Sequence, residues 1–311
     1  MGALESGSVA TAARARRAPR DARARRASVL GAYPYWFYLP AAIVFGIIFI
    51  VPTLLAFYYS LTRWTLFDAE FIGLDNFFLF FREPALTSGL QNTIVYAVVT
   101  SGLKVILGLL LAALLTSSIR LRDLLRSVIF FPVLVSTVAV GITFAVLLHP
   151  SDGLVNIALE RIGIDGPTWL GDPDLALLSV ALVDVWKGIG IALVIFIAAI
   201  LSIPEEYNDA VRLEGGSWTK FRYITVPLSR NATFTVILLS FIGGLRTFDL
   251  IWTMTRGGPG FASDVIASTI YKQYQAGFYG LATAGNVILF IGVAAIVYPL
   301  MRVFARREIE L

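Results

Sequence analysis

Five ionisable side chains lie inside long apolar stretches of the sequence, where charge is costly and often serves a function. They are Lys104, Asp184, Lys187, Arg246 and Asp249. Asp184 and Lys187 are three residues apart, as are Arg246 and Asp249, so each pair would share one face of a helix. We therefore expect each acid to be neutralised within its own helix and to face the protein interior. The partner of Lys104 is left open.

The rest of the sequence offers few residues for catalysis. There is no cysteine and only one histidine, His149, which falls at the outer end of an apolar stretch and is interpreted as an interfacial residue. No zinc-protease motif and no nucleophile elbow occur, which argues against an intramembrane enzyme. No Gly-x-x-x-x-Gly-Lys-Ser/Thr motif occurs either, so we do not expect this chain to bind ATP through a P-loop. The sequence predicts a non-catalytic protein with no metal or cofactor of its own.

Composition indicates a membrane protein. Of 311 residues, 57% are hydrophobic and only 15% are charged. In soluble domains about 45–50% of the residues are apolar and about 25% are charged. A helix crosses roughly 30 Å of hydrocarbon with about 20 apolar residues. The six stretches of that length predict an all-α protein with six transmembrane helices, at 37–59, 94–117, 128–148, 176–201, 232–254 and 281–303.

The basic residues between these stretches predict the orientation, because cytoplasmic loops carry an excess of Lys and Arg. With the N-terminus inside, the cytoplasmic segments hold 17 of them. Seven lie in the first 32 residues, three in the second connection, four in the fourth and three at the C-terminal end (Arg302, Arg306 and Arg307). The outer segments hold only five, which are Arg63, Arg82, Arg161, Arg256 and Lys272. Both termini are therefore expected in the cytoplasm.

The chain divides into a tail and a membrane domain. Residues 1–32 are polar and rich in arginine, and we interpret them as a disordered cytoplasmic tail rather than a secretory signal, whose apolar core is shorter than the stretch that follows here. Residues 33–311 form the predicted transmembrane domain. The basic residues fall in short patches between apolar stretches, so they indicate topology and not nucleic-acid binding.

One cytoplasmic connection, residues 202–230, is long and patterned. Ser202 and Glu205 have the spacing of a capping box, and Pro204 fits the first turn, so a helix is expected from residue 203 to 213. Gly215 and Gly216 should end it. A second short helix is expected through Trp218, Phe221 and Ile224, before Pro227 and the return to the membrane. The apolar side chains of such a helix–turn–helix could fill a groove on another protein.

This connection resembles a known motif. The run Asp209-Ala210-Val211-Arg212-Leu213-Glu214-Gly215-Gly216, followed by Phe221, Ile224 and Pro227, is similar to the EAA loop of ABC importer permeases. It departs from that pattern at Asp209, where the family has Glu, and at Gly216, where Ala is usual. Both changes are conservative in charge or size.

Further segments in the same order resemble the carbohydrate-uptake branch of these permeases, which serves maltose, trehalose and glycerol phosphate. They are Gly73-Leu74-Asp75-Asn76-Phe77, Trp169-Leu170-Gly171-Asp172-Pro173, Asp184-Val185-Trp186-Lys187-Gly188, and Phe248-Asp249-Leu250-Ile251 leading to Thr255-Arg256-Gly257-Gly258-Pro259. The resemblance spans roughly residues 35–305 and implies a type I ABC importer permease fold with a cytoplasmic coupling helix.

The resemblance also implies partners and a role. The chain would pair with a second, homologous permease in a bacterial or archaeal inner membrane, above two copies of an ATPase that bind ATP and Mg²⁺. An external sugar-binding protein would deliver a di- or oligosaccharide. The loop would contact the ATPase through Asp209, Ala210, Arg212, Glu214, Gly215, Gly216, Phe221 and Pro227.

Sugar contacts in related permeases come from the helices that flank this loop. Matched by position, the resemblance implies a path along Lys187, Gly188, Ile191, Ser240, Gly243, Gly244 and Thr247. Ser240, Gly244 and Thr247 are spaced by four and three residues, which independently places them on one helical face. Gly243 and Gly244 fit close helix packing equally well.

Several alternatives stay open. The solute could be a glycerol phosphate or another compound instead of a sugar, and the partner permease could hold it instead of this chain. The loop could lie on lipid headgroups as an amphipathic helix. A stand-alone secondary transporter is less favoured, because the sequence has no inverted repeat and such a protein has no use for an EAA-like loop.

Overall fold

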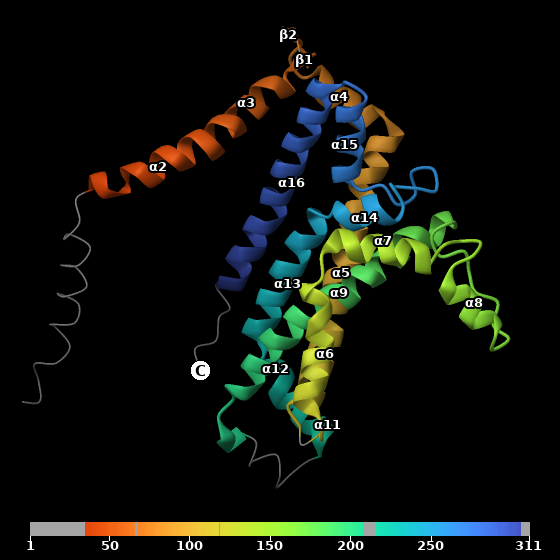
Figure 1. Ribbon diagram of the computed structural model, residues 1–311. Helices are drawn as coiled ribbons and strands as arrows, with labels where there is room; N and C mark the ends of the chain where they lie inside the picture. The colour runs from red at the N-terminus through yellow and green to blue at the C-terminus, as the bar shows by residue number, and fades with distance from the viewer. Residues whose placement is uncertain (1–34, 66, 118, 208–215, 306–311) are drawn as a thin grey trace, which may run out of the picture. The chain divides into compact units, whose positions relative to one another are not determined.

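The computed structural model describes residues 35–65, 67–117, 119–207 and 216–305 (Figure 1). The predicted tail, residues 1–32, lies outside these ranges. The chain divides into two units, residues 1–55 and 56–311, and each is described by itself. Apart from one two-stranded hairpin, the described elements are helices, which confirms the predicted all-α class.

The first unit is one apolar helical segment. It comprises the 3₁₀ turn η1 (Tyr35–Tyr38), α2 (Leu39–Phe45), the π-helical turn η2 (Gly46–Ile50) and the start of α3 (Val51–Ser60). No residue between Trp36 and Ile50 is buried, although nearly all are apolar. This segment corresponds to the first predicted span.

Three more helices have the length and apolar composition to cross a bilayer. They are α5 (Pro84–Leu115), α9 (Pro173–Leu201) and α16 (Tyr279–Ala305). They match the predicted spans at 94–117, 176–201 and 281–303. The helix α5 begins ten residues earlier than expected, with Pro84 in its first turn, where a proline has no hydrogen bond to lose.

The third predicted span is not one helix. The chain forms α6 (Arg122–Leu134) and α7 (Thr137–Leu147), which are bent by 98° at their junction. Pro132 lacks the amide hydrogen of a helical turn, and Val135 and Ser136 then take extended backbone angles, with ψ of 141° and 133°. The prediction of a continuous helix over 128–148 is therefore wrong.

The fifth predicted span, 232–254, is also wrong as a continuous helix. It is divided into α13 (Arg230–Leu245) and the short α14 (Asp249–Met254). Gly243 and Gly244 weaken the last turn of α13, and Phe248 leaves the helical region with φ of −142°. A second bend of 65° at Ser229 separates α13 from the segment Ser217–Leu228. Among the described residues, four helices could span a membrane, or six spans if each bent pair counts as one.

Smaller elements connect these helices. The hairpin of β1 (Thr62–Trp64) and β2 (Ala69–Phe71) is antiparallel, with Arg63 opposite Glu70. It is followed by α4 (Asp75–Arg82), while α8 (Leu154–Glu160) follows α7. The helix α15 (Ile266–Gln275) packs against α16 and α5. These elements belong to the connections that the sequence predicts on the outer side.

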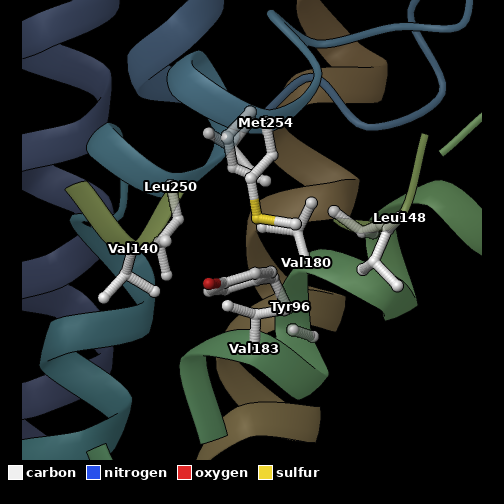
Figure 2. Close-up of a cluster of buried hydrophobic side chains, with 11 residues drawn as sticks. Tyr96, Val140, Leu148, Val180, Val183, Leu250 and Met254 are labelled. Atoms are coloured by element: carbon white, nitrogen blue, oxygen red, sulfur yellow. The ribbon is translucent and has the colours of Figure 1, made fainter. Parts of the chain in front are cut away.

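The core forms where α5 packs against α9 and α13, which lie side by side (Figure 1). Figure 2 shows Tyr96 of α5 surrounded by Val180 and Val183 of α9, Val140 of α7 and Leu250 of α14. A second cluster of Ala112, Leu193, Phe196, Ala232 and Val236 joins α5, α9 and α13 further along. The two clusters hold α5, α9 and α13 as one packed body and bring their polar residues together.

Candidate functional site

A pocket of about 170 Å³ lies between α5, α9 and α13, and we call it the inner pocket. Its walls are mostly aliphatic, with one ammonium, one carboxylate and one hydroxyl. The residues that line it are Lys104, Asp184, Gly188, Ile191, Ala192, Ile195, Val236, Leu239, Ser240 and Gly243. A concave apolar site with a few converging polar groups is the usual form of a small-molecule site, although in this chain its volume lies below the roughly 300–1,000 Å³ of such sites.

Lys104 and Asp184 form an ion pair in the wall of the inner pocket. The Lys104 Nζ lies 2.8 Å from the Asp184 Oδ2, and the side chains are only 10% and 21% exposed. Gly188 makes this geometry possible, since a Cβ at that position would lie 2.8 Å from Lys104 Cε and 2.9 Å from Nζ. The pair therefore joins α5 to α9 and neutralises both charges beside the pocket.

The expected pairing of Asp184 with Lys187 is wrong, because Asp184 faces α5 and pairs with Lys104 instead. The expected pairing of Arg246 with Asp249 is not found among the described residues, where both side chains are exposed. The helix ends at Leu245, so Arg246 and Asp249 do not have the i, i+3 relation of a continuous helix.

The buried hydroxyl of Tyr96 adds a polar group near the pair. It interacts electrostatically with Asp184 and Thr247, although among the described residues no contact to it has the distance and angles of a regular hydrogen bond. Thr247 lies in the break between α13 and α14. The break thus brings Thr247 to Tyr96, which also interacts with Asp184.

Four of the residues expected along the substrate path line the inner pocket: Gly188, Ile191, Ser240 and Gly243. Gly243 has open space where a Cβ would lie. Lys187, Gly244 and Thr247 are not among the lining residues.

The face of α13 that lines the inner pocket differs from the expected one. It carries Val236, Ser240 and Gly243, whereas Gly244 faces α5. A Cβ on Gly244 would lie 2.6 Å from Ala97 Cα, so this glycine permits close helix packing. Sequence reasoning did not assign Lys104, Asp184, Ala192, Ile195, Val236 or Leu239 to the pocket, although the cost of charge in a membrane had singled out the first two.

The connection 202–230 is described only in part. Asp209, Ala210, Arg212, Glu214 and Gly215 lie outside the described residues, within 208–215. The second helix is present as α11 (Ser217–Lys220), the π-helical turn η3 (Phe221–Thr225) and α12 (Val226–Leu228). Gly216 precedes it, Phe221 lies within it and Pro227 falls in α12, one residue before the bend at Ser229.

Exposed rings characterise this second helix. The Trp218 and Tyr223 side chains are each 72% exposed. The Phe221 ring lies 5.7 Å from that of Trp218, while Ile224 is buried. The helix therefore has one anchored face and one apolar face that no residue of the described part of the chain covers.

The expected capping box of Ser202 and Glu205 is wrong. The Ser202 hydroxyl donates to the Ala199 carbonyl at 2.8 Å and so completes the end of α9. A helical turn does follow Pro204, at residues 205–207. The hydroxyl serves the preceding helix because Ser202 is still in the helical region, with ψ of −7°.

The loop between α14 and α15 is held by buried polar groups. The fully buried Asp264 accepts hydrogen bonds from Lys272 Nζ at 2.6 Å and Ser268 Oγ at 2.7 Å. Asn92 of α5 donates to the carbonyls of Ala262 and Asp264. These bonds fix the loop on α5. No group of three or more His, Cys, Asp or Glu that could hold a metal occurs among the described residues.

Comparisons with known proteins agree with this architecture. Residues 104–310 match the family described as binding-protein-dependent transport system inner membrane component. The chain is 35% identical to the probable ABC transporter permease protein YurN of Bacillus subtilis, over 84% of this chain and 92% of that protein. It is 29% identical to the trehalose/maltose transport system permease protein MalF of Thermococcus litoralis, over 86% and 92% of the two chains.

A solved structure has the same fold. It is a bacterial ABC transporter involved in the import of the acidic polysaccharide alginate, matched with a TM-score of 0.75 over 93% of this chain and 99% of that one. The sequence identity is 22%, so this likeness concerns the fold alone. It confirms the predicted fold of an ABC importer permease.

Proposed function

The chain belongs to the family of binding-protein-dependent transport system inner membrane components, and from this premise we propose that it is the permease through which an ABC importer moves a neutral di- or oligosaccharide into the cell. The proposal is supported by the similarity to permeases of the carbohydrate-uptake branch. The observation that carries it within the chain is the inner pocket, where polar groups able to bind hydroxyls converge at mid-span.

The inner pocket suits a neutral solute because its two charges cancel. Lys104 donates hydrogen bonds and Asp184 accepts them, so together they offer a donor and an acceptor 2.8 Å apart. Vicinal hydroxyls of a sugar present the complementary pattern. Ser240 adds a hydroxyl, and Gly243 leaves space for the ring. Gly188 and Ile191 complete the path on α9, and Lys187, Gly244 and Thr247 support it from adjacent positions.

A glycerol phosphate is the second candidate solute. A phosphate would need an uncompensated positive charge, and Lys104 is already paired. The ion pair therefore favours a sugar as the solute. Measuring the uptake of both compounds decides between them.

The loop 202–230 is the proposed contact with the ATPase. Its exposed Trp218 and the ring pair of Trp218 and Phe221 are suited to a groove on a partner. The proposed coupling residues are Asp209, Ala210, Arg212, Glu214, Gly215, Gly216, Phe221 and Pro227. The loop would move as a rigid body when the ATPase subunits close and would transmit that motion to α9 and α13, which flank it.

The proposed assembly contains a second permease, two copies of the ATPase and an external sugar-binding protein. Both termini would lie in the cytoplasm, with residues 1–32 as a tail on the transmembrane domain 33–311. Mass spectrometry of the complex retained by the tagged chain in mild detergent should detect both permeases and the ATPase in a ratio of 1:1:2. Recovery of this chain alone, or as a homo-oligomer, would contradict the proposal.

Transport itself is tested with that complex in proteoliposomes, together with its binding protein. Uptake of radiolabelled maltose, trehalose, lactose and glycerol 3-phosphate is measured with and without ATP. ATP-dependent uptake of at least one sugar is expected. Uptake driven by an ion gradient without ATP would instead favour a secondary transporter.

Coupling is tested with Gly215→Trp, which should leave ATP hydrolysis intact and abolish uptake. Gly292→Trp on α16 is a matched control, because no atom lies within 4 Å of where its Cβ would be. Full uptake by Gly215→Trp would show that the loop has no coupling role.

A further inference from the structure

We propose that a second sugar-binding site lies at the outer end of the protein, in a cavity lined by aromatic rings. The cavity measures about 460 Å³, within the range of small-molecule sites. Five rings contribute to it, and we call them the aromatic cup: Trp64, Phe248, Tyr271, Tyr274 and Tyr279. The ligand class is a sugar ring, so the inference rests on the proposed function.

The rings of the cup come from four separate elements. Trp64 belongs to the hairpin, Phe248 to the break before α14, Tyr271 and Tyr274 to α15, and Tyr279 to the start of α16. Aromatic residues are common at membrane interfaces, where they spread around the perimeter of a protein. Here they converge on one cavity, which an interfacial belt does not require.

Direct contacts between the rings hold them in place. The centroid of Trp64 lies 4.3 Å from Tyr59 in a stacked pair and 5.5 Å from Tyr279. Tyr274 lies 5.2 Å from Tyr279. Because each ring is fixed by a neighbour, the flat faces are arranged before a ligand arrives, which lowers the entropic cost of binding.

The approach of the hairpin to α16 is built into the sequence. Asn76 Nδ2 donates to the carbonyls of Ser60 at 2.9 Å and Thr62 at 2.8 Å. Gly280 leaves room for the Thr62 carbonyl, whose oxygen would lie 2.1 Å from a Cβ at that position. These two features place Trp64 beside Tyr279, the residue that precedes this glycine.

Polar groups on α16 complete the cavity. Thr283 and Asn286 line it. The Thr283 hydroxyl donates to the Tyr279 carbonyl at 2.7 Å, and the Asn286 amide donates one bond to the Ala282 carbonyl. A hydroxyl oxygen also accepts hydrogen bonds, and an amide has further donors and acceptors. Flat apolar faces together with nearby hydrogen-bonding groups match a sugar, whose ring has both.

The cup and the inner pocket differ in one way that makes the site testable. The cup has five aromatic rings, whereas the inner pocket has none among its lining residues. Saturation of aromatic protons by NMR should therefore transfer more strongly to a sugar in the cup than to one in the inner pocket, and substitution of a cup ring distinguishes the two sites.

The experiment uses the whole permease–ATPase complex in lipid nanodiscs, without nucleotide and without the binding protein. Maltose, trehalose and lactose are the probes, at millimolar concentration. Saturation transfer to the ring protons of at least one sugar is expected. Trp64→Leu and Tyr279→Leu should each lower it about 2- to 10-fold, the loss expected when one ring contact is removed. Trp64→Phe, which keeps a flat ring, should retain most of it.

Tyr298→Leu is the matched control, since this tyrosine is exposed on the same helix, α16, but is not in the cup. ATP hydrolysis by each variant complex verifies that it is assembled. No transfer to any of the three sugars in the wild type, or equal transfer in Trp64→Leu and the wild type, overturns the cup. An equal loss in Trp64→Phe and Trp64→Leu also overturns it.

The two proposals fail separately. ATP-dependent uptake in proteoliposomes with no aromatic transfer would reject the cup and leave the proposed function standing. Transfer that reaches lipid acyl protons but no sugar would assign the cup to a lipid chain. Absence of uptake for every sugar in the wild type would contradict the proposed function, whatever the NMR result.

Discussion

The inner pocket and the aromatic cup use opposite chemistry at two depths of the same molecule. The inner pocket relies on one ion pair among aliphatic walls, held between α5 and α9. The cup has no charged lining residue and relies on rings from a hairpin, a break and two helices. Deep in the protein a charge is tolerated only when an opposite charge neutralises it. The cup uses partly exposed rings such as Tyr271 and Tyr274, which bring no charge that would need to be neutralised.

The inner pocket and the aromatic cup should also differ in their tolerance to substitution. Residues of the inner pocket lie in the packed interface of long helices, whereas the hairpin that carries Trp64 is a small element with two short strands. We therefore expect substitutions near the inner pocket to affect folding and transport together, and substitutions near the cup to affect binding more selectively.

Lys104→Met should have the largest effect, because it leaves the Asp184 carboxylate buried without a partner. Breaking a buried pair from one side costs about 3–5 kcal/mol. The Tm of the purified complex should fall, and uptake should be lost. The double substitution Lys104→Met with Asp184→Leu should restore the Tm, since an apolar replacement of the whole pair is often neutral, but should not restore uptake. Normal uptake by the double variant would remove the pair from the substrate path.

Substitutions at the neighbouring glycines Gly243 and Gly244 of α13 should have different effects, one on helix packing and the other on transport. Gly244→Leu should destabilise the protein by about 1–3 kcal/mol, because the new side chain meets Ala97 of α5. Gly243→Leu should leave the Tm unchanged and block uptake, because its side chain enters open space in the inner pocket. Thermal unfolding and uptake are measured for both. Equal Tm losses in the two variants would contradict the assignment of their faces.

Gly280→Ala should act on the cup alone. The added methyl group would meet the Thr62 carbonyl and displace the hairpin with Trp64. Because the clash is with backbone that Asn76 holds in place, a loss of stability of about 1–3 kcal/mol should accompany the displacement. Aromatic saturation transfer to the sugar should decrease as it does in Trp64→Leu. Gly292→Ala on the same helix, in open space, should change neither the Tm nor the transfer.

The smallest effect is expected for the ion pair of the hairpin itself. Arg63 and Glu70 lie 3.4 Å apart, with both side chains 70% exposed. Exposed pairs of this kind contribute about 0.2–1 kcal/mol at most. The Tm of Arg63→Ala should therefore differ little from the wild type, and raising the salt concentration should have no further effect on it. A loss comparable to that of Lys104→Met would show that the two regions are not as different as described.

Hydropathy predicted most of the membrane helices but not their interruptions. The spans around α5, α9 and α16 follow from apolar length. The turns at Val135 and near Thr247 cannot be predicted from apolar length, because the sequence is apolar on both sides of each turn. Pro132 and the pair Gly243-Gly244 were the available signals. Proline and glycine are tolerated in continuous membrane helices too, so neither decides the matter alone.

The candidate site was predictable by residue type but not by partner. The sequence singled out Lys104 and Asp184 as buried charges, yet spacing favoured Lys187 as the partner of Asp184. That choice ignores packing between helices, which only the structure supplies. Gly188 is an example, since its role is to admit the Lys104 side chain from another helix. The aromatic cup could not have been found from spacing, because its residues are distributed from Trp64 to Tyr279.

The bend between α6 and α7 has a consequence for the solvation of the backbone. A helix of 13 residues such as α6 is about 20 Å long, so the chain turns before it could cross a bilayer. Such a turn leaves backbone amides and carbonyls without helical hydrogen bonds. Lipid cannot form these hydrogen bonds, so protein or water must provide the partners. The short helix α7 packs on α14, which follows the other break, and Gly141 permits contact with Thr253. The two interruptions thus shelter each other, and neither half-helix could be stable in hydrocarbon alone.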